Sequence, residues 1–77
     1  MTVTVLLTTP LFVLEHVEGP TPAGSVVVSG SLRGVGNGGV ELAAEKYRDA
    51  RGKELGGRPA MLFLPLAKID HIIYHEG

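Results

Sequence analysis

Two histidines near the C-terminal end are the side chains best suited to chemistry. His71 and His75 are four residues apart, and because alternate side chains of a strand share a face, both would project from one face of an extended segment. Imidazole binds zinc, yet zinc sites use three or four protein ligands, and Asp70 and Glu76 fall in the opposite register. A metal centre would need His16 or a residue from a second subunit. We therefore expect no metal site and no cofactor, and rank a small metal-dependent hydrolase last of three functional hypotheses.

Nucleophilic catalysis has fewer candidates still. The chain has no cysteine, and its serines at 25, 29 and 31 lie in strand-like surroundings without the strand-to-helix elbow that exposes a catalytic serine. Tyr47 and Tyr74 are interpreted as packing residues at the edge of the fold. The sequence therefore predicts a protein that is not an enzyme.

Size and composition predict one small domain, residues 1–77, that needs partners. A chain of 77 residues buries only about 60% of the surface that its unfolded form exposes, and no disulfide can add to its stability. Hydrophobic residues make up 44% of the chain and charged residues 19%, where about 25% charged is usual. Spare apolar surface is most simply explained by self-association. We expect a homo-oligomer, which could also carry an unidentified protein partner.

Positive charge is confined to the second half of the chain. The formal net charge is −1, and no Lys or Arg precedes Arg33, whereas residues 46–58 hold five cations interleaved with acidic residues. We interpret these residues, which include Lys46 and Arg48, as a solvated hairpin loop of mixed charge. Because alternating signs weaken the field that a polyanion feels, we exclude coating of nucleic acid by bulk charge, although a local anion-binding patch stays open. No basic leader and no apolar run of about 18 residues is present. We expect a cytoplasmic protein without a membrane partner.

The stretch from Ser25 to Tyr47 has the clearest structural signal. Gly36-Asn37-Gly38-Gly39 supplies positive-φ positions between two hydrophobic runs, which predicts a tight β-hairpin. Cradling a phosphate is the alternative for these glycines, but the Gly-Lys-Ser/Thr ending of such loops is missing. After the hairpin, residues 41–51 include good helix formers, so an α+β fold with a helix there is the alternative. Alternation of apolar and charged residues over 40–45 favours a strand, followed by a turn at 49–53, and hence an all-β fold.

Three other segments complete the expected sheet. Residues 3–17 are predicted to be extended and bent at Pro10, with a short helix capped by Thr9 as the alternative, and 19–24 to be a loop. Residues 58–66 form a strand that ends or bends at Pro65, and 69–74 form the last strand. Residues 61–64 are apolar on both faces, so both must be covered. We predict an oligomer interface with these members: Met61, Phe63, Leu64 and Ile72.

A run of glycine and hydrophobic residues in the pattern Gly-x-hydrophobic-x-Gly-hydrophobic is formed by Gly30-Ser31-Leu32-Arg33-Gly34-Val35. Residues 25–75, which contain it, resemble the Sm-like family of small, strongly bent, five-stranded β-barrels, whose members carry such a run in the bent second strand. Val40-Glu41-Leu42 with Glu45 would stand in the third strand, and Met61 to Ile72 in the fourth strand, short turn and fifth strand. The resemblance implies an Sm-like or SH3-like barrel and a ring of copies joined by strand pairing.

The same resemblance implies RNA binding only in part. RNA-binding members carry an Asp-x-x-x-Asn type loop and a later Arg-Gly type pair, and this chain has 36–39 and Pro65-Leu66-Ala67-Lys68 at those positions. Neither loop has an aromatic residue for base stacking. The side chains and backbone left for RNA or anion binding are Arg33, Asn37, Gly38 and Lys68. We rank a non-catalytic assembly or scaffold module first and an RNA-binding protein second.

Overall fold

A computed structural model describes residues 1–11 and 21–76. Within these residues the elements are β1 (Thr2–Leu7), β2 (Val27–Gly36), β3 (Gly39–Arg48), β4 (Glu54–Leu55), β5 (Ala60–Pro65), the 3₁₀ turn η1 (Leu66–Lys68) and β6 (Ile69–Tyr74). The all-β prediction is confirmed, and the alternative helix over 41–51 is wrong, because β3 and a turn occupy that span. Our expectations for His16 and for the extended segment over 12–17 lie outside the described residues.

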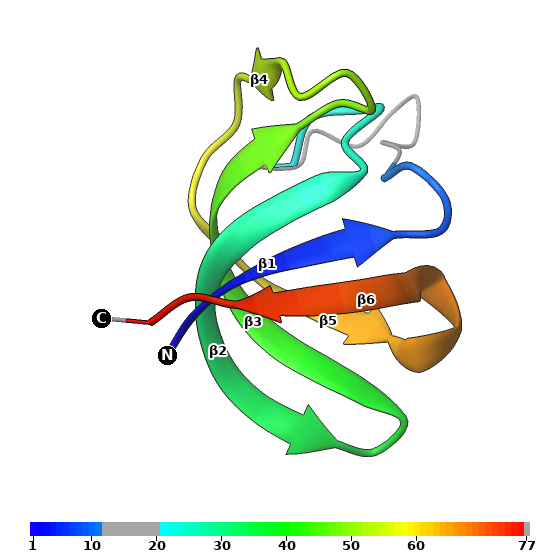
Figure 1. The fold of residues 1–77 in the computed structure, drawn as a ribbon, viewed down its shortest axis with the longest axis vertical. Coiled ribbons are helices and arrows are strands. Elements are labelled where there is room, and N and C mark those ends of the chain that lie inside the picture. The colour runs from blue at the N-terminus through cyan, green and yellow to red at the C-terminus, as the bar shows by residue number, and fades with distance from the viewer. Residues whose placement is uncertain (12–20, 77) are drawn as a thin grey trace.

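The strands form one antiparallel sheet that curls into a half-barrel (Figure 1). The order is β4-β3-β2-β1-β6, and β5 also pairs with β3. Strand β3 serves both neighbours because its first half, Gly39–Ala44, pairs with β5, while Tyr47 and Arg48 pair with β4. The two strands β5 and β6 therefore lie at opposite ends of the sheet, and in the described part of the chain each has a single partner strand.

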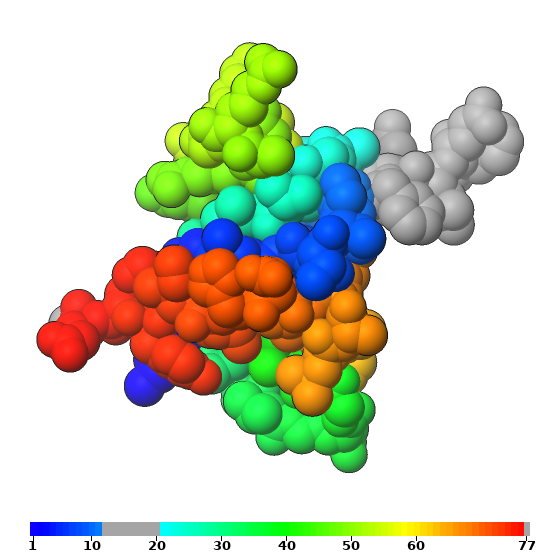
Figure 2. All heavy atoms as spheres, turned by 45° about the vertical axis from the view of Figure 1, so that its right-hand side comes forward, coloured from blue at the N-terminus to red at the C-terminus, as the bar shows by residue number. Residues whose placement is uncertain are grey.

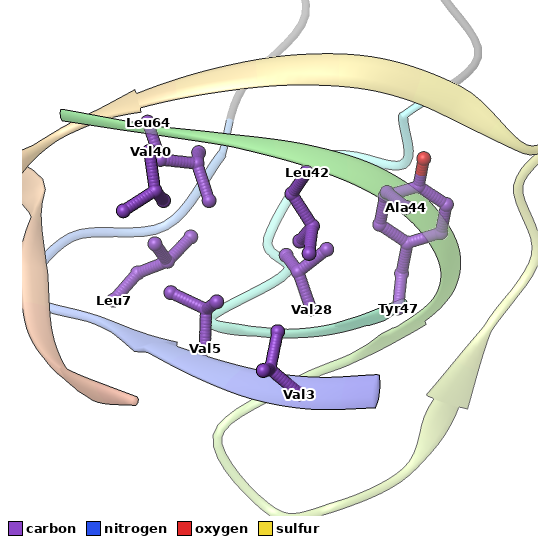
Figure 3. Close-up of a cluster of buried hydrophobic side chains, with 9 residues drawn as sticks. All are labelled: Val3, Val5, Leu7, Val28, Val40, Leu42, Ala44, Tyr47 and Leu64. Carbon is purple, nitrogen blue, oxygen red and sulfur yellow. The ribbon is translucent and has the colours of Figure 1, made fainter. Parts of the chain in front are cut away.

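The core lies on the inner face of this curl, where Figure 3 shows nine side chains directed toward one another. In β1 the alternation is complete: Val3, Val5 and Leu7 are buried, and the residues between them are more exposed. Tyr47 lies at one end of the cluster and is 1% exposed, so our interpretation of it as an edge residue is wrong. Its hydroxyl donates a hydrogen bond of 3.0 Å to the carbonyl oxygen of Arg58. The other core residues are Val28, Val40, Leu42, Ala44 and Leu64.

The sheet can curl because β2 and β3 approach very closely at Gly30. A Cβ at this position would overlap the carbonyl oxygen of Ala43 and lie 3.0 Å from the Cα of Ala44. At the same place the register shifts: Ser29 faces Lys46 and Gly30 faces Ala44, which leaves Glu45 unpaired in a β-bulge. A bulge bends its strand and increases the local twist. Gly30 and the bulge together bend the two long strands.

The two predicted turns are confirmed. Gly36 pairs with Gly39, and Asn37 and Gly38 between them have φ values of 54° and 80°, the signs that a two-residue type I′ hairpin requires. In the turn over residues 49–53, Gly52 has φ 84° and donates its N–H to the carbonyl oxygen of Asp49. The Asp49 carboxylate accepts two backbone N–H bonds of 2.9 Å, from residues 51 and 53.

The last two strands were also predicted, with small differences at their ends. The strand expected over 58–66 is β5, residues 60–65, and it ends at Pro65, which lacks the N–H needed to continue the ladder. The strand expected over 69–74 is β6 with the same bounds. Within the described residues, no helix has the length and apolar composition needed to cross a membrane.

Candidate functional site

The structure brings two of the predicted RNA-contacting turns into contact. The carbonyl oxygen of Gly38, in the β2–β3 hairpin, accepts a hydrogen bond of 2.9 Å from the N–H of Leu66, the first residue of η1. Figure 2 shows the hairpin and η1 side by side on the surface. Lys68 ends η1, but its ammonium donates to Thr9 Oγ1 at 2.9 Å and to the Pro10 carbonyl at 3.3 Å. The amine is thus already bound to the segment that follows β1.

Arg33 and Asn37 have different settings. Arg33 is exposed and is the unpaired residue of a second β-bulge, since Leu32 faces Leu42 while Gly34 faces Glu41. Asn37 occupies the hairpin tip, where its positive φ already accounts for the choice of Asn, a residue that adopts this conformation more readily than most. The four predicted residues therefore form two groups: the pair of turns that meet at Gly38, and Arg33 by itself on β2.

The predicted oligomer interface divides between the surface and the core. Met61 and Phe63 project outward from β5 and are 62% and 50% exposed. Leu64 was predicted to lie in the interface, but it is 2% exposed and belongs to the core. The reason is strand alternation, which turns 62 and 64 inward when 61 and 63 face outward. Ile72 is half-buried against the core cluster.

The strands β5 and β6 each present large apolar side chains beside an edge that has no partner strand among residues 1–11 and 21–76. On β5, Met61 adjoins a shallow hollow, whose lining is mainly apolar: Ala43, Ala44, Glu45, Pro59, Ala60 and Met61. On β6, Ile73 and Tyr74 are 44% and 54% exposed. An exposed edge with unpaired N–H and C=O groups can extend its sheet with a strand from another chain. The two ends of the sheet therefore have the features of strand-pairing surfaces.

The two C-terminal histidines contact different partners. His71 Nδ1 lies 2.6 Å from Asp70 Oδ2, and both side chains are more than half exposed. Their contact is allowed by a bulge in β6, where Leu6 faces His71 and Leu7 faces Ile69, so that Asp70 is left out of the simple alternation. Across residues 1–11 and 21–76, no three His, Cys, Asp or Glu side chains gather closely enough to hold a metal ion.

A polar cluster on the outer face of β1 and β2 was not predicted from the sequence. Thr4 Oγ1 lies 2.6 Å from His75 Nε2 and 3.1 Å from Ser29 Oγ. Lys46 and Arg48, which the sequence placed in a charged hairpin loop, are strand residues of β3. They line a second hollow together with Thr4, Ser29 and His75. The alternation of Thr with Val in β1 signals an outward polar face, but the strand register that joins these residues is not visible in the sequence.

Burial changes the ionisation of Tyr47. It raises the pKa of the Tyr47 phenol above its ordinary value of 10.0, because a phenolate would lose its hydration in the core. The phenol is therefore neutral at physiological pH and serves as a hydrogen-bond donor.

No family model, curated protein or solved structure matches the chain.

Proposed function

We propose that the protein is a non-catalytic, Sm-like module that assembles into a closed homo-oligomer and acts as a scaffold. The observation that carries this proposal is that β5 and β6 each have one edge without a partner strand in the described part of the chain. A half-barrel with one helical turn before its last strand supports an Sm-like module, and the exposed apolar residues beside each edge support association.

The two edge strands are equal in length. Each strand has six residues, so β6 of one copy can lie antiparallel to β5 of the next and satisfy the free backbone groups of both. Burial of Phe63 and Ile73 at this junction adds a hydrophobic contribution, about 25 cal/mol for each Å² of apolar surface removed from water. Pairing of this kind covers apolar side chains that a monomer leaves in water.

Such an interface is heterologous, since it joins different surfaces of the two copies. A heterologous interface extends head to tail and closes into a ring when the rotation between copies permits. Every copy then uses both edges, which removes the free strand edges that otherwise promote aggregation. The proposed scaffold is therefore a ring whose outer and inner faces remain available to partners.

The decisive experiment uses two edge variants that complement each other. Light scattering of the unmodified protein at micromolar concentration should give the mass of an oligomer, a whole multiple of the 8.1 kDa chain greater than one. Phe63→Lys on β5 and Ile73→Lys on β6 should each be monomers, because a charge at the junction would be buried without a partner. A mixture of the two should form a heterodimer, since each variant retains the edge that the other has lost.

The matched control is Val35→Lys, which places the same charge on an apolar residue of β2 that is 70% exposed and lies on neither terminal strand. It should keep the mass of the unmodified protein. A monomeric unmodified protein would refute the proposal. Monomeric edge variants that do not pair when mixed would exclude the head-to-tail arrangement.

RNA binding is a second candidate, favoured by the contact between Gly38 and Leu66 that joins the hairpin to η1. A labelled mixed-sequence RNA should bind at low salt, and its affinity should fall as salt rises, because cations replace the contacts of Lys and Arg. Arg33→Gln should weaken binding and reduce this salt dependence. An RNA that shows no change in anisotropy at low salt would remove this candidate.

A further inference from the structure

A row of polar side chains crosses β1, β2 and β3 on the outer face of the sheet. Thr4 of β1 is paired directly with Ser29 of β2, and Ser29 with Lys46 of β3. Directly paired residues of neighbouring strands project from the same face. His75, which follows β6, reaches this row through its contact with Thr4. Four separate segments of the chain thus place polar side chains at one point.

These residues surround a hollow rather than a flat surface. Its lining is Thr2, Thr4, Ser29, Gly30, Glu45, Lys46, Arg48 and His75. The hollow coincides with the bulge at Glu45, where the ladder between β2 and β3 is interrupted. A bulge redirects the side chains that flank it, and bulges are often found beside functional sites. The β-bulge at Glu45, which helps to bend the sheet, therefore also shapes this hollow.

The charge of the hollow is opposite to that of the whole chain. Lys46 and Arg48 supply two positive charges, and Glu45 is the one carboxylate among the lining residues. Neither cation forms an ion pair in the described part of the chain, where the contact between Asp70 and His71 is the only pair within 4.0 Å. An oxyanion in the hollow would satisfy two cations that otherwise interact only with solvent.

The neutral groups are arranged to donate as well. When His75 donates from Nε2 to Thr4 Oγ1, Thr4 can donate to Ser29 Oγ, and the hydroxyl hydrogen of Ser29 is then free for a third acceptor. In this chain of hydrogen bonds the last donor is the Ser29 hydroxyl, which lies beside Lys46. Lys46 and Arg48 can form charge-assisted hydrogen bonds, and together with the Ser29 hydroxyl on the neighbouring strand they form a donor set that suits phosphoryl oxygens.

We propose that the hollow formed by Thr4, Ser29, Lys46, Arg48 and His75 binds a phosphate-type oxyanion, either free phosphate or the phosphomonoester of a small molecule. Two cations match the charge of about −1.5 to −2 that a phosphomonoester carries at pH 7. The hollow is open to solvent, so an ester group can extend outward. This inference does not depend on the proposed oligomer, because a single copy contains every residue involved.

The test is a titration followed by amide resonances in ¹H–¹⁵N spectra of the full chain. Inorganic phosphate and glycerol 3-phosphate are the two probes, added at constant ionic strength, and either should shift the amides of residues 4, 29 and 46. Tighter binding of the ester would identify a phosphorylated small molecule as the ligand, and equal affinity would identify free phosphate. A short RNA that shifts these amides while both probes leave them unchanged would overturn the proposal.

Variants separate a specific site from general charge. Lys46→Gln and Ser29→Ala should weaken binding, the first by about tenfold or more, because a charge-assisted hydrogen bond is lost. Lys53→Gln removes the same charge from the exposed turn over residues 49–53 and should leave the affinity unchanged. Equal loss in Lys46→Gln and Lys53→Gln would show attraction by net charge and would exclude the site.

Discussion

Replacement of a single glycine tests how the sheet is bent. In Gly30→Ala the new Cβ would overlap the Ala43 carbonyl oxygen and approach the Ala44 Cα to 3.0 Å. Both are backbone atoms of the neighbouring strand, so no side-chain rotation can relieve the overlap and β3 itself must move. Overpacking of this kind costs about 1–3 kcal/mol, and we expect the upper end of the range because the obstacle is backbone.

Gly34→Ala is the matched control on the same strand. Among the described residues, no atom of a non-neighbouring residue lies within 4 Å of a Cβ at this position, and Gly34 does not have a positive φ. An alanine there should leave stability unchanged or raise it by about 0.4–1 kcal/mol, because it restricts the unfolded chain. The two variants, which are identical in chemistry, should therefore differ by about 3–4 kcal/mol in the free energy of unfolding.

Thermal unfolding followed by far-ultraviolet circular dichroism measures this difference directly. For a domain of this size 1 kcal/mol shifts Tm by about 4–8 °C, so Gly30→Ala should unfold about 12–24 °C below the unmodified protein. Gly34→Ala should unfold at the same temperature or a few degrees higher. Equal Tm values for the two variants would refute the conclusion that close contact at Gly30 bends the sheet.

Three more predictions concern the core, the hairpin and alkaline pH. Because burial raises the Tyr47 pKa, the unfolded chain ionises first: the free energy of unfolding should be steady below pH 10, fall above it, and level off beyond the folded-state pKa. Tyr47→Phe should lower the free energy of unfolding by about 1 kcal/mol, because the hydrogen bond to the Arg58 carbonyl is lost. In urea titrations from pH 8 to 11.5, the free energy of unfolding of this variant should fall less than that of the unmodified protein. Equal falls in the two proteins would contradict this prediction. Leu42→Ala, at a site that is 0% exposed, should cost about 2–5 kcal/mol in urea unfolding, whereas Leu66→Ala, at 59% exposure, should cost little, and similar losses would argue against this core. Asn37→Ala should destabilise by about 1–2 kcal/mol because of its positive φ, while Asn37→Gly should be neutral in the same assay; a neutral Asn37→Ala would disprove the turn role.

Local patterns carried most of the fold prediction. The alternation of Thr4 with Val3 and Val5, the Gly/Asn tetrad at 36–39 and the missing N–H of Pro65 depend only on neighbours in the chain, and each predicted its element correctly. The choice between strand and helix over 41–51 was also decided correctly by alternation. These signals are visible in the sequence because they arise from backbone preference and side-chain direction over a few residues.

The candidate site was predicted less well, and bulges are the reason. Side chains of a strand alternate between the two faces of the sheet only while the pairing register is unbroken. After the unpaired residue of a β-bulge, the following side chains lie on the opposite face from the one that simple alternation predicts. Asp70 therefore meets His71, although parity assigns them to opposite faces. Lys46 joins the polar row on β1 and β2, although its neighbours along the chain indicated a solvated loop.

The sequence by itself determined the all-β class, the turns and the apolar character of β5. Only the tertiary structure decided that Leu64 is core while Phe63 is surface, that Tyr47 is buried, and that Thr4, Ser29 and Lys46 form one row. These outcomes depend on contacts between residues far apart in the chain, above all the close approach of Gly30 to Ala43. Turn chemistry is local, whereas register and curvature are set by the packing of strands against one another.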